Sequence, residues 1–146
     1  MTIAAILKRK GTGAITIAPR ASIAEACRVL AEHRIGAMPV TDPHDDSRVL
    51  GMLSERDIVR TLATHGATAL DFAAERLMTP LVATASPLTT VPEAMTLMTE
   101  RRCRHLPVMQ GDRMIGIVSI GDIVKERIEQ AVHEAESLKA YVAGAA

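Results

Sequence analysis

Two serine–aspartate pairs are the residues of this chain whose types and spacing could do chemistry. Ser54 precedes Asp57 by three positions, and Ser119 precedes Asp122 by three. A hydroxyl and a carboxylate at this spacing form a capping box, which satisfies backbone amides at the start of a helix. The same carboxylate suits a vicinal diol such as that of a ribose, and the free amides of the helix end suit phosphate. Spacing alone leaves both interpretations open, plain capping and ligand binding.

The choice of aspartate distinguishes these pairs from two further capping boxes. Ser22-x-x-Glu25 and Thr90-x-x-Glu93 precede helical patterns of apolar residues and use glutamate. Aspartate is one methylene shorter, so we expect it to reach the cap amide less easily than glutamate. The shorter, fixed carboxylates of Asp57 and Asp122 therefore favour reception of a diol.

The residues around the two pairs are duplicated. Pro39-Val40 returns as Pro107-Val108 after 68 positions, and Gly51-x-x-Ser54-x-x-Asp57 returns as Gly116-x-x-Ser119-x-x-Asp122 after 65. The difference falls in a polar turn that is longer in the first copy. Two copies of one unit predict two supersecondary units packed face to face about a pseudo-twofold axis. Any ligand sites would then come in pairs.

Hydrophobic spacing predicts the same elements in each copy, namely strand, helix, strand, strand, helix. The fold class expected is mixed α+β, with βαββα repeats. The expected strands are 14–17, 37–41 and 49–53 in the first copy, and 81–84, 105–109 and 114–118 in the second. Asp45–Ser47 and Gly111–Asp112 are the expected turns. The predicted units are a lead-in (1–13, with a short helix over 2–10), repeat one (14–66), a linker helix (67–80), repeat two (81–128) and a C-terminal helical extension (129–146).

The C-terminal segment keeps an apolar pattern well beyond the second repeat. The apolar positions are spaced alternately by four and three residues: Val124, Ile128, Ala131, Ala135, Leu138 and Val142. Such spacing is typical of a coiled-coil seam or of a helix docked on a partner. The alternative is a helix folded back on its own domain. We expect a homodimer, because a soluble monomer would otherwise expose this stripe.

Composition excludes several functions. Seventeen basic and seventeen acidic residues cancel, and the chain has no Trp, one Phe and one Tyr. A nucleic-acid partner is therefore not expected, since it would need a basic excess or aromatic platforms. No apolar run is long enough to span a membrane, so no membrane partner is expected and a cytoplasmic location is the default. The two cysteines and five histidines lack metal-ligand spacing. Without a phosphate loop, nucleophile elbow or ligand cluster, no catalysis is expected.

Taken together, these motifs resemble a tandem pair of cystathionine beta-synthase (CBS) domains, the Bateman module, of the stand-alone bacterial type. The residues that carry the resemblance are Met38-Pro39-Val40, Leu106-Pro107-Val108, the two Gly-x-x-Ser-x-x-Asp elements, and Leu77-Met-Thr-Pro80 before the second copy. The resemblance extends from about residue 14 to residue 128. It implies a regulatory module that binds an adenine nucleotide such as AMP, ADP, ATP or NAD(H), or an S-adenosyl compound, and has no catalytic cofactor.

The resemblance also implies contacts for each part of such a ligand. Asp57 and Asp122 would meet the ribose hydroxyls, with Ser54 and Ser119 beside them. The adenine would slip between the first strand and the strand that carries Pro-Val. By position, this nominates Thr16 with Ala37, Met38 and Pro39 for one pocket, and Thr84 with His105, Leu106 and Pro107 for the other.

Phosphate needs cations, and the two copies differ in this respect. Arg56 precedes Asp57, whereas the matching position of the second copy is Gly121. Arg104 and His105 stand close before Pro107, where the first copy has Gly36 and Ala37. We expect Arg56, Arg104 and His105 to contact phosphate and the two sites to be unequal, whereas Arg101 and Arg102 can equally belong to a solvated helix face.

The module is expected to act in trans on an unknown regulated protein as an energy or redox sensor. One alternative is a protein that buffers nucleotide, and another is a ligand-free dimeric interaction or scaffold protein. The duplicated aspartates favour ligand binding over the last alternative.

Overall fold

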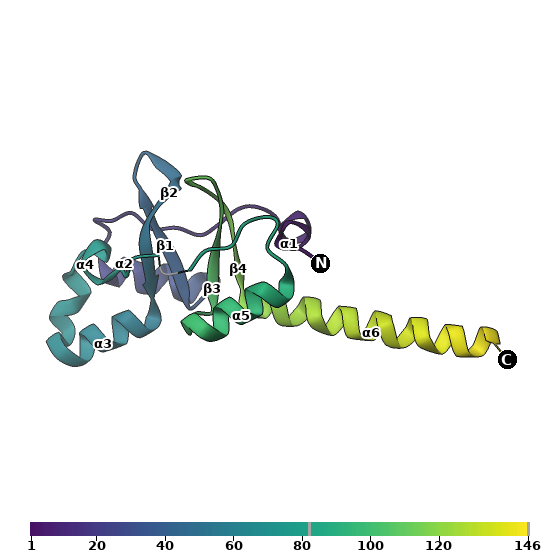
Figure 1. Cartoon of the computed structure of the whole chain (residues 1–146). Helices are drawn as coiled ribbons and strands as arrows, with labels where there is room; N and C mark the ends of the chain where they lie inside the picture. The colour runs from purple at the N-terminus through teal and green to yellow at the C-terminus, as the bar shows by residue number, and fades with distance from the viewer. Residues whose placement is uncertain (82, 146) are drawn as a thin grey trace.

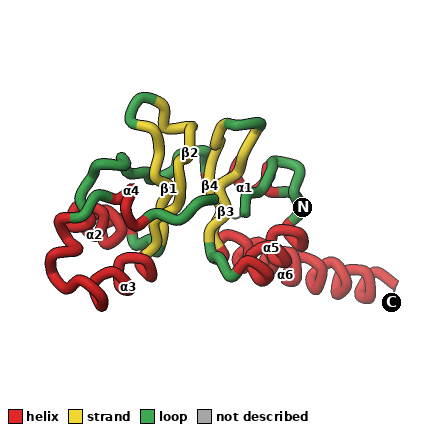
Figure 2. Tube along the Cα trace, turned by 60° about the vertical axis from the view of Figure 1, so that its left-hand side comes forward, coloured by secondary structure: helices red, strands yellow, loops and turns green. Residues whose placement is uncertain are grey.

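Two antiparallel β-hairpins stand side by side in the molecule (Figure 1 and Figure 2). The computed structural model describes residues 1–81 and 83–145. The first hairpin consists of β1 (Ala37–Asp42) and β2 (Asp45–Ser54), and the second of β3 (His105–Gln110) and β4 (Arg113–Ser119). Helices lie against each hairpin. This arrangement confirms the predicted mixed α+β fold of two like units.

The first strand predicted in each copy is much shorter than expected. Within 14–17 only Ile17 pairs, through its amide to the Pro39 carbonyl at 3.0 Å and through its carbonyl to the Thr41 amide at 3.0 Å. In the second copy the pairing residue is Ala85, one position beyond the predicted 81–84, of which Val82 lies outside the described residues. The prolines that follow two positions later offer no N–H for a ladder, so each strand ends after one bridge.

The turn of the first hairpin also differs from the prediction. The chain reverses at Pro43 and His44, and Asp45–Ser47 already belong to β2. The Asp42 side chain accepts from the His44 amide at 2.8 Å, which fixes a turn that begins two positions before the predicted one. The second turn is at Gly111 and Asp112 as predicted, and Gly111 adopts a φ of 66°.

Four helices complete the two repeats. They are α2 (Ile23–His33) and α3 (Glu55–His65) in the first copy, and α5 (Val91–Arg101) and α6 (Ile120–Ala145) in the second. The hydroxyls of Ser22 and Thr90 accept from the amides of Glu25 and Glu93 at 3.1 and 3.2 Å. Both capping residues therefore begin a helix where the sequence predicted one.

The segments that lead into each copy pack on the other copy. The predicted N-terminal helix is α1 (Ile3–Lys10), ended by Gly11, and its buried Ile3, Ile6 and Leu7 lie in the core of the second copy. Ala74 and Leu77 of α4 (Ala74–Leu77) lie in the core of the first copy. Each copy therefore has its own apolar core, closed by a helix from elsewhere in the chain.

A continuous linker helix over 67–80 was expected, and this prediction is wrong. The chain forms a 3-10 helix (Gly66–Asp71) and the single turn of α4, separated by extended backbone at Phe72 and Ala73. The Phe72 carbonyl accepts from the Ile23 amide at 2.9 Å, and the Ala74 amide donates to the Ala21 carbonyl at 2.8 Å. These backbone pairings to the start of α2 replace the helical ones.

Helix α6 leaves the body as a rod and does not fold back (Figure 1). It runs without a break from the second repeat through the expected extension. Most of its apolar side chains are exposed, including Ile128 at 59% and Leu138 at 64%. Among the described residues, no helix is long and apolar enough to cross a membrane.

Candidate functional site

Asp57 and Ser54 form a complete capping box at the start of α3. Oδ2 of Asp57 accepts from the Ser54 amide at 3.1 Å and from the Ser54 hydroxyl at 2.8 Å, while the Asp57 amide donates to the Ser54 hydroxyl at 3.2 Å. The expectation that aspartate would reach the cap amide poorly is wrong, because the helix start places the carboxylate directly over it. Among the described residues, Oδ1 of Asp57 has no hydrogen-bond partner.

Asp122 and Ser119 repeat this geometry at the start of α6, with one added cation. Oδ2 of Asp122 accepts from the Ser119 amide at 2.8 Å, and the Asp122 amide donates to the Ser119 hydroxyl at 3.2 Å. The place held by a serine hydroxyl in the first copy is taken by the ammonium of Lys10, at 2.6 Å from Oδ2. The first copy has no such ion pair at Asp57 within the described residues.

The charge state of Asp122 reflects these neighbours. Partial burial raises the pKa of the Asp122 carboxyl, but the hydrogen bond and charge of Lys10 and the Ser119 donors outweigh it, so the pKa lies below its usual value. Asp122 is therefore ionised at neutral pH. Its carboxylate can therefore form the ion pair with Lys10 at the neutral pH at which a nucleotide would bind.

Strand register brings the residues predicted to hold adenine next to the serine–aspartate pairs. Ala37 at the start of β1 lies opposite Ser54 on β2, and His105 at the start of β3 lies opposite Ser119 on β4. Antiparallel pairing puts such partners a few ångströms apart. The backbone of these two strand starts is thus within reach of a ligand held at the helix N-termini.

The other residues predicted for the adenine pockets differ in exposure. Met38 and Leu106 are completely buried in the two cores, so their side chains are occupied by packing. Pro39 and Pro107 are buried as well, and their carbonyls accept from Ile17 and Ala85. Thr16 is half-buried and Thr84 is exposed, next to those two bridge residues.

His105 is a neutral imidazole at the edge of the second site. Burial lowers its pKa, and the nearby Lys10 and Arg104 lower it further, against a smaller opposite effect of Asp122 and Glu55. Without ligand, His105 therefore contributes hydrogen bonding but no positive charge at neutral pH. An anion placed beside His105 would raise its pKa.

Arg56 and Arg104, predicted separately as phosphate contacts, line the same hollow. It has a volume of about 310 Å³ and lies between the start of α3, the end of α5 and the start of α6. Arg102, which the sequence left as a possible helix-face residue, is the left-handed end of α5 (φ 52°) and lines the hollow too. Three arginines therefore border one open depression, and this composition suits an anion.

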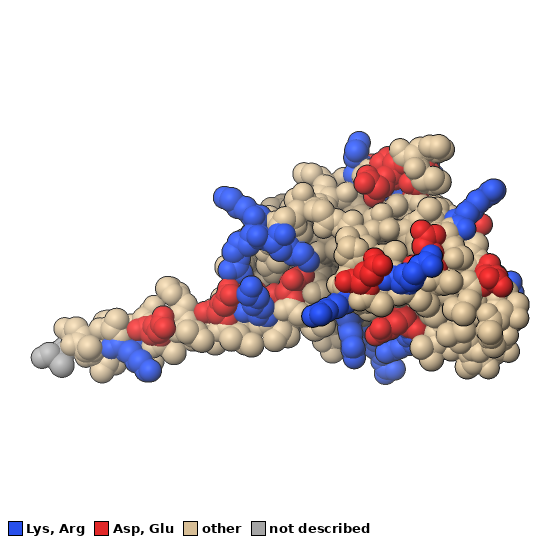
Figure 3. Space-filling model, turned by 180° about the vertical axis from the view of Figure 1, so that it is seen from behind, with Lys and Arg blue, Asp and Glu red and all other residues tan. Residues whose placement is uncertain are grey.

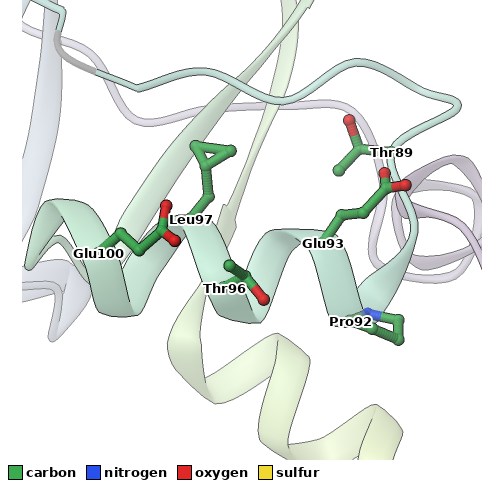
Figure 4. A pocket seen from close by; sticks show the side chains of 6 residues that line it. All are labelled: Thr89, Pro92, Glu93, Thr96, Leu97 and Glu100. Carbon is green, nitrogen blue, oxygen red and sulfur yellow. The ribbon is translucent and has the colours of Figure 1, made fainter.

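A second hollow lies along α5, lined by residues of that helix and by Thr89 (Figure 4). Its volume is about 460 Å³, and its lining includes Glu93 and Glu100 together with Leu97. Glu93 already accepts from the Thr90 amide at 3.1 Å as part of the cap. Two carboxylates and no cation make this hollow unsuited to a phosphate, so it is not part of the candidate site.

The described residues contain no group of three or more His, Cys, Asp or Glu side chains that could hold a metal ion. Cys27 and Cys103 are separate, half-buried thiols. Burial raises the pKa of the Cys103 thiol, so it is not an activated nucleophile. The chemistry of the candidate site is thus that of hydrogen-bond acceptors, helix N-termini and cations.

Comparison with known proteins identifies the repeat. Residues 11–64 and 74–129 each match the CBS domain. The CBS domain-containing protein CBSX3, mitochondrial, from Arabidopsis thaliana is 32% identical over 149 residues, which span 98% of this chain and 72% of the relative.

Two solved structures have the same fold. The CBS-domain containing protein ATU1752 from Agrobacterium tumefaciens has a TM-score of 0.81 at 41% identity and covers 87% of this chain and 99% of its own. The CBS domain protein PAE2072 from Pyrobaculum aerophilum, complexed with AMP, has a TM-score of 0.73 at 27% identity, over 84% of this chain and 89% of its own. The chain therefore belongs to the family of CBS-domain proteins and carries two such domains in tandem.

Proposed function

We propose that this protein is a regulatory module that binds adenine nucleotides at two related sites and performs no catalysis. Asp57 and Asp122 receive the ribose hydroxyls, with Ser54 and Ser119 beside them. Binding changes how the module acts on a separate protein. The observation that carries the proposal is the duplicated carboxylate at a helix N-terminus, which keeps one oxygen free of partners among the described residues after capping is satisfied.

The AMP complex of PAE2072 supports the ligand class. That protein shares the fold of this chain and holds an adenine nucleotide. The proposal transfers the class of ligand, not the individual contacts. In this chain the backbone at Ala37 and His105, together with Thr16 and Thr84, would frame the adenine, and the buried Met38, Pro39, Leu106 and Pro107 would hold that frame in place.

The hollow lined by Arg56, Arg102 and Arg104 supports a phosphate-bearing ligand. Arg56 comes from the first copy and Arg104 from the second, so an anion between them would be held by both copies at once. A bound phosphate would then affect the relative position of the two units. A ligand shifts such an equilibrium only by the difference of its affinities for the two arrangements. Phosphate contacts from both copies are one source of that difference.

Calorimetric titration with a ligand panel tests the proposed function. AMP, ADP, ATP, NAD(H) and S-adenosylmethionine should include at least one compound that binds saturably, whereas guanosine monophosphate serves as the control for the base. The sugar and phosphate of the control are the same as those of AMP. If every adenine compound fails to bind, or if the guanine control binds equally well, adenine recognition is absent.

We further propose that the exposed apolar face of α6 pairs with a second copy of the chain. The alternating spacing of four and three along Val124, Ile128, Ala131, Ala135, Leu138 and Val142 fits another helix with the same spacing. In a parallel pair, Glu134 of one copy would face Lys139 of the other, and the reverse, which gives two opposite-charge contacts at the flanks. A ligand-free interaction protein would share this face but would not need the two free carboxylate oxygens.

A further inference from the structure

Lys10 is a component of the second site that lies outside both repeats. Its ammonium donates to Oδ2 of Asp122 at 2.6 Å and to the Ile117 carbonyl at 2.9 Å. In the first copy, the equivalent of Ile117 is Met52, whose carbonyl accepts instead from the Thr79 backbone amide at 2.9 Å. A charged side chain in the second copy thus takes the place of a neutral backbone donor in the first.

Lys10 is held rigidly because α1 is anchored in the core. Ile3 is completely buried, and Ile6 and Leu7 are almost so. A β-carbon on Gly116 would lie 2.8 Å from Cδ2 of Leu7, so α1 rests directly on the backbone of β4. An anchored helix of this kind does not leave the site readily, which makes the Lys10 ammonium a fixed part of the cleft.

Ion pairs between α1 and α6 add to this anchoring. Arg9 pairs with Glu129 at 2.8 Å and with the buried Glu126. Figure 3 shows basic and acidic side chains gathered together where the long helix leaves the body. The last turn of α1 is therefore tied to α6 by ion pairs with three carboxylates, those of Asp122, Glu126 and Glu129. The pairs of Arg9 help to hold the neighbouring Lys10 beside Asp122.

The start of β3 beside Lys10 carries a cation that the start of β1 in the first copy lacks. Lys10 and Arg104 are both close enough to His105 to lower its pKa. The residues at the positions of Arg104 and His105 in the first copy are Gly36 and Ala37, which carry no charge. An ammonium has three N–H donors, and the two acceptors named above use two of them. One donor of Lys10 is left for a ligand.

We propose that Lys10 is a ligand-binding residue that makes the second site select anionic adenine nucleotides over uncharged adenosine. Its free N–H and charge meet the phosphate next to the ribose that Asp122 receives. Within the part of the chain that the structure describes, the carboxylate of the first site has no paired cation, so a change at Lys10 should leave that site's preference for phosphate as it is. This inference rests on the proposed function and assigns a specificity to one of its two sites.

The test compares AMP with adenosine, which share base and ribose and differ in the phosphate. Both are titrated into Asp57→Ala, which weakens the first site so that the second site dominates the titration, and then into Asp57→Ala combined with Lys10→Met. The Lys10→Met change should weaken AMP about tenfold to a hundredfold, as expected for loss of one charge-assisted hydrogen bond, and should leave adenosine within about threefold. Lys8→Met is the matched control, because Lys8 is exposed in the same turn and has no ion pair among the described residues.

The charge-preserving variant Lys10→Arg should retain most of the preference for AMP, and Lys10→Gln should behave as Lys10→Met does. Circular dichroism of each variant checks that α1 remains folded, and Lys10→Gln replaces Lys10→Met if the latter unfolds. An unchanged ratio of AMP to adenosine affinity overturns the inference, as does tighter AMP binding, which would mean that Lys10 competes with the ligand. If the parent protein binds no adenine compound at all, the proposed function fails instead, and this is seen before any Lys10 variant is made.

Discussion

At the scale of single residues, His105 is the titratable group whose pKa the proposed phosphate would change. Its side chain is half-buried beside Lys10 and Arg104, and its pKa is below the ordinary value near 6.5. A phosphate bound beside it favours the imidazolium and would raise this pKa. At the proposed site, ligand binding would therefore be coupled to protonation of His105.

The sign of the coupling gives a prediction. Because the bound state carries the higher pKa, nucleotide binding should take up protons, and affinity should rise as pH falls from 7.5 towards 6. Calorimetry at pH 6.5 in two buffers of different ionisation enthalpy measures the uptake directly. His105→Gln should abolish it, whereas His133→Gln on the exposed part of α6 should not. Equal heats in both buffers for the parent protein would contradict the placement of phosphate at His105.

The sequence predicts the site residues that occur in both repeats better than those that occur only once. Ser54, Asp57, Ser119 and Asp122 stand out because each element occurs twice at a fixed spacing, and both pairs have the predicted capping geometry. Lys10 could not be found in this way, since it is 112 positions from Asp122 and belongs to no repeat. Arg102 was ambiguous because only the end of α5 turns it into the hollow of Arg56 and Arg104.

At the scale of elements, the exchanged lead-in segments explain two repeated glycines. A β-carbon on Gly51 would lie 2.7 Å from the Thr79 carbonyl oxygen and 3.0 Å from Sδ of Met78. On Gly116 it would lie 2.8 Å from the side chain of Leu7. Each glycine thus allows a lead-in segment to lie directly on a strand. The obstacle is fixed backbone in the first copy and a side-chain end in the second.

This difference predicts unequal costs for the same substitution. Gly51→Ala should lower the free energy of unfolding by about 1–3 kcal/mol, as is usual for overpacking against groups that cannot move. Gly116→Ala should cost less, because Leu7 can adjust its rotamer. Urea denaturation of both variants provides the comparison. If Gly116→Ala were the less stable of the two variants, Leu7 on α1 would be less able to move aside than the backbone at Thr79, and the prediction would be wrong.

The elements themselves were predictable to different degrees. The four long strands and the capped helices follow from hydrophobic period and capping boxes, which are local signals. The first strands shrink to single bridges and the linker helix breaks, because backbone pairing to distant segments decides both. The packing of α1 on the second copy depends on tertiary contacts, and no pattern within residues 1–13 indicates it.

At the scale of the whole molecule, α6 is the element through which we propose that the chain pairs with a second copy. It projects from the body with Ile128 and Leu138 exposed, and one face carries the alternating apolar spacing. Ile128→Lys and Leu138→Lys should each weaken dimerisation at least about tenfold. Each change removes, from both copies, an apolar side chain that the proposed helix pair would bury. Light scattering over a concentration series measures the dimer fraction.

The control for assembly is Glu136→Lys, which changes charge on the same helix outside the apolar face. It should leave the dimer intact. Because all three side chains are exposed in the single chain, none of the changes should alter its fold. A parent protein that scatters as a monomer at every concentration would exclude the proposed pairing.

The central claim is that each repeat holds one adenine nucleotide through its aspartate, and the count of bound AMP tests it most directly. Equilibrium dialysis at saturating AMP should give two molecules per chain for the parent protein, with Asp57→Ala and Asp122→Ala each weakened about tenfold to a hundredfold at one site only. Combining both substitutions should weaken both sites. Parent-like binding of two AMP molecules by the doubly substituted protein, or no binding by the parent, would contradict the account.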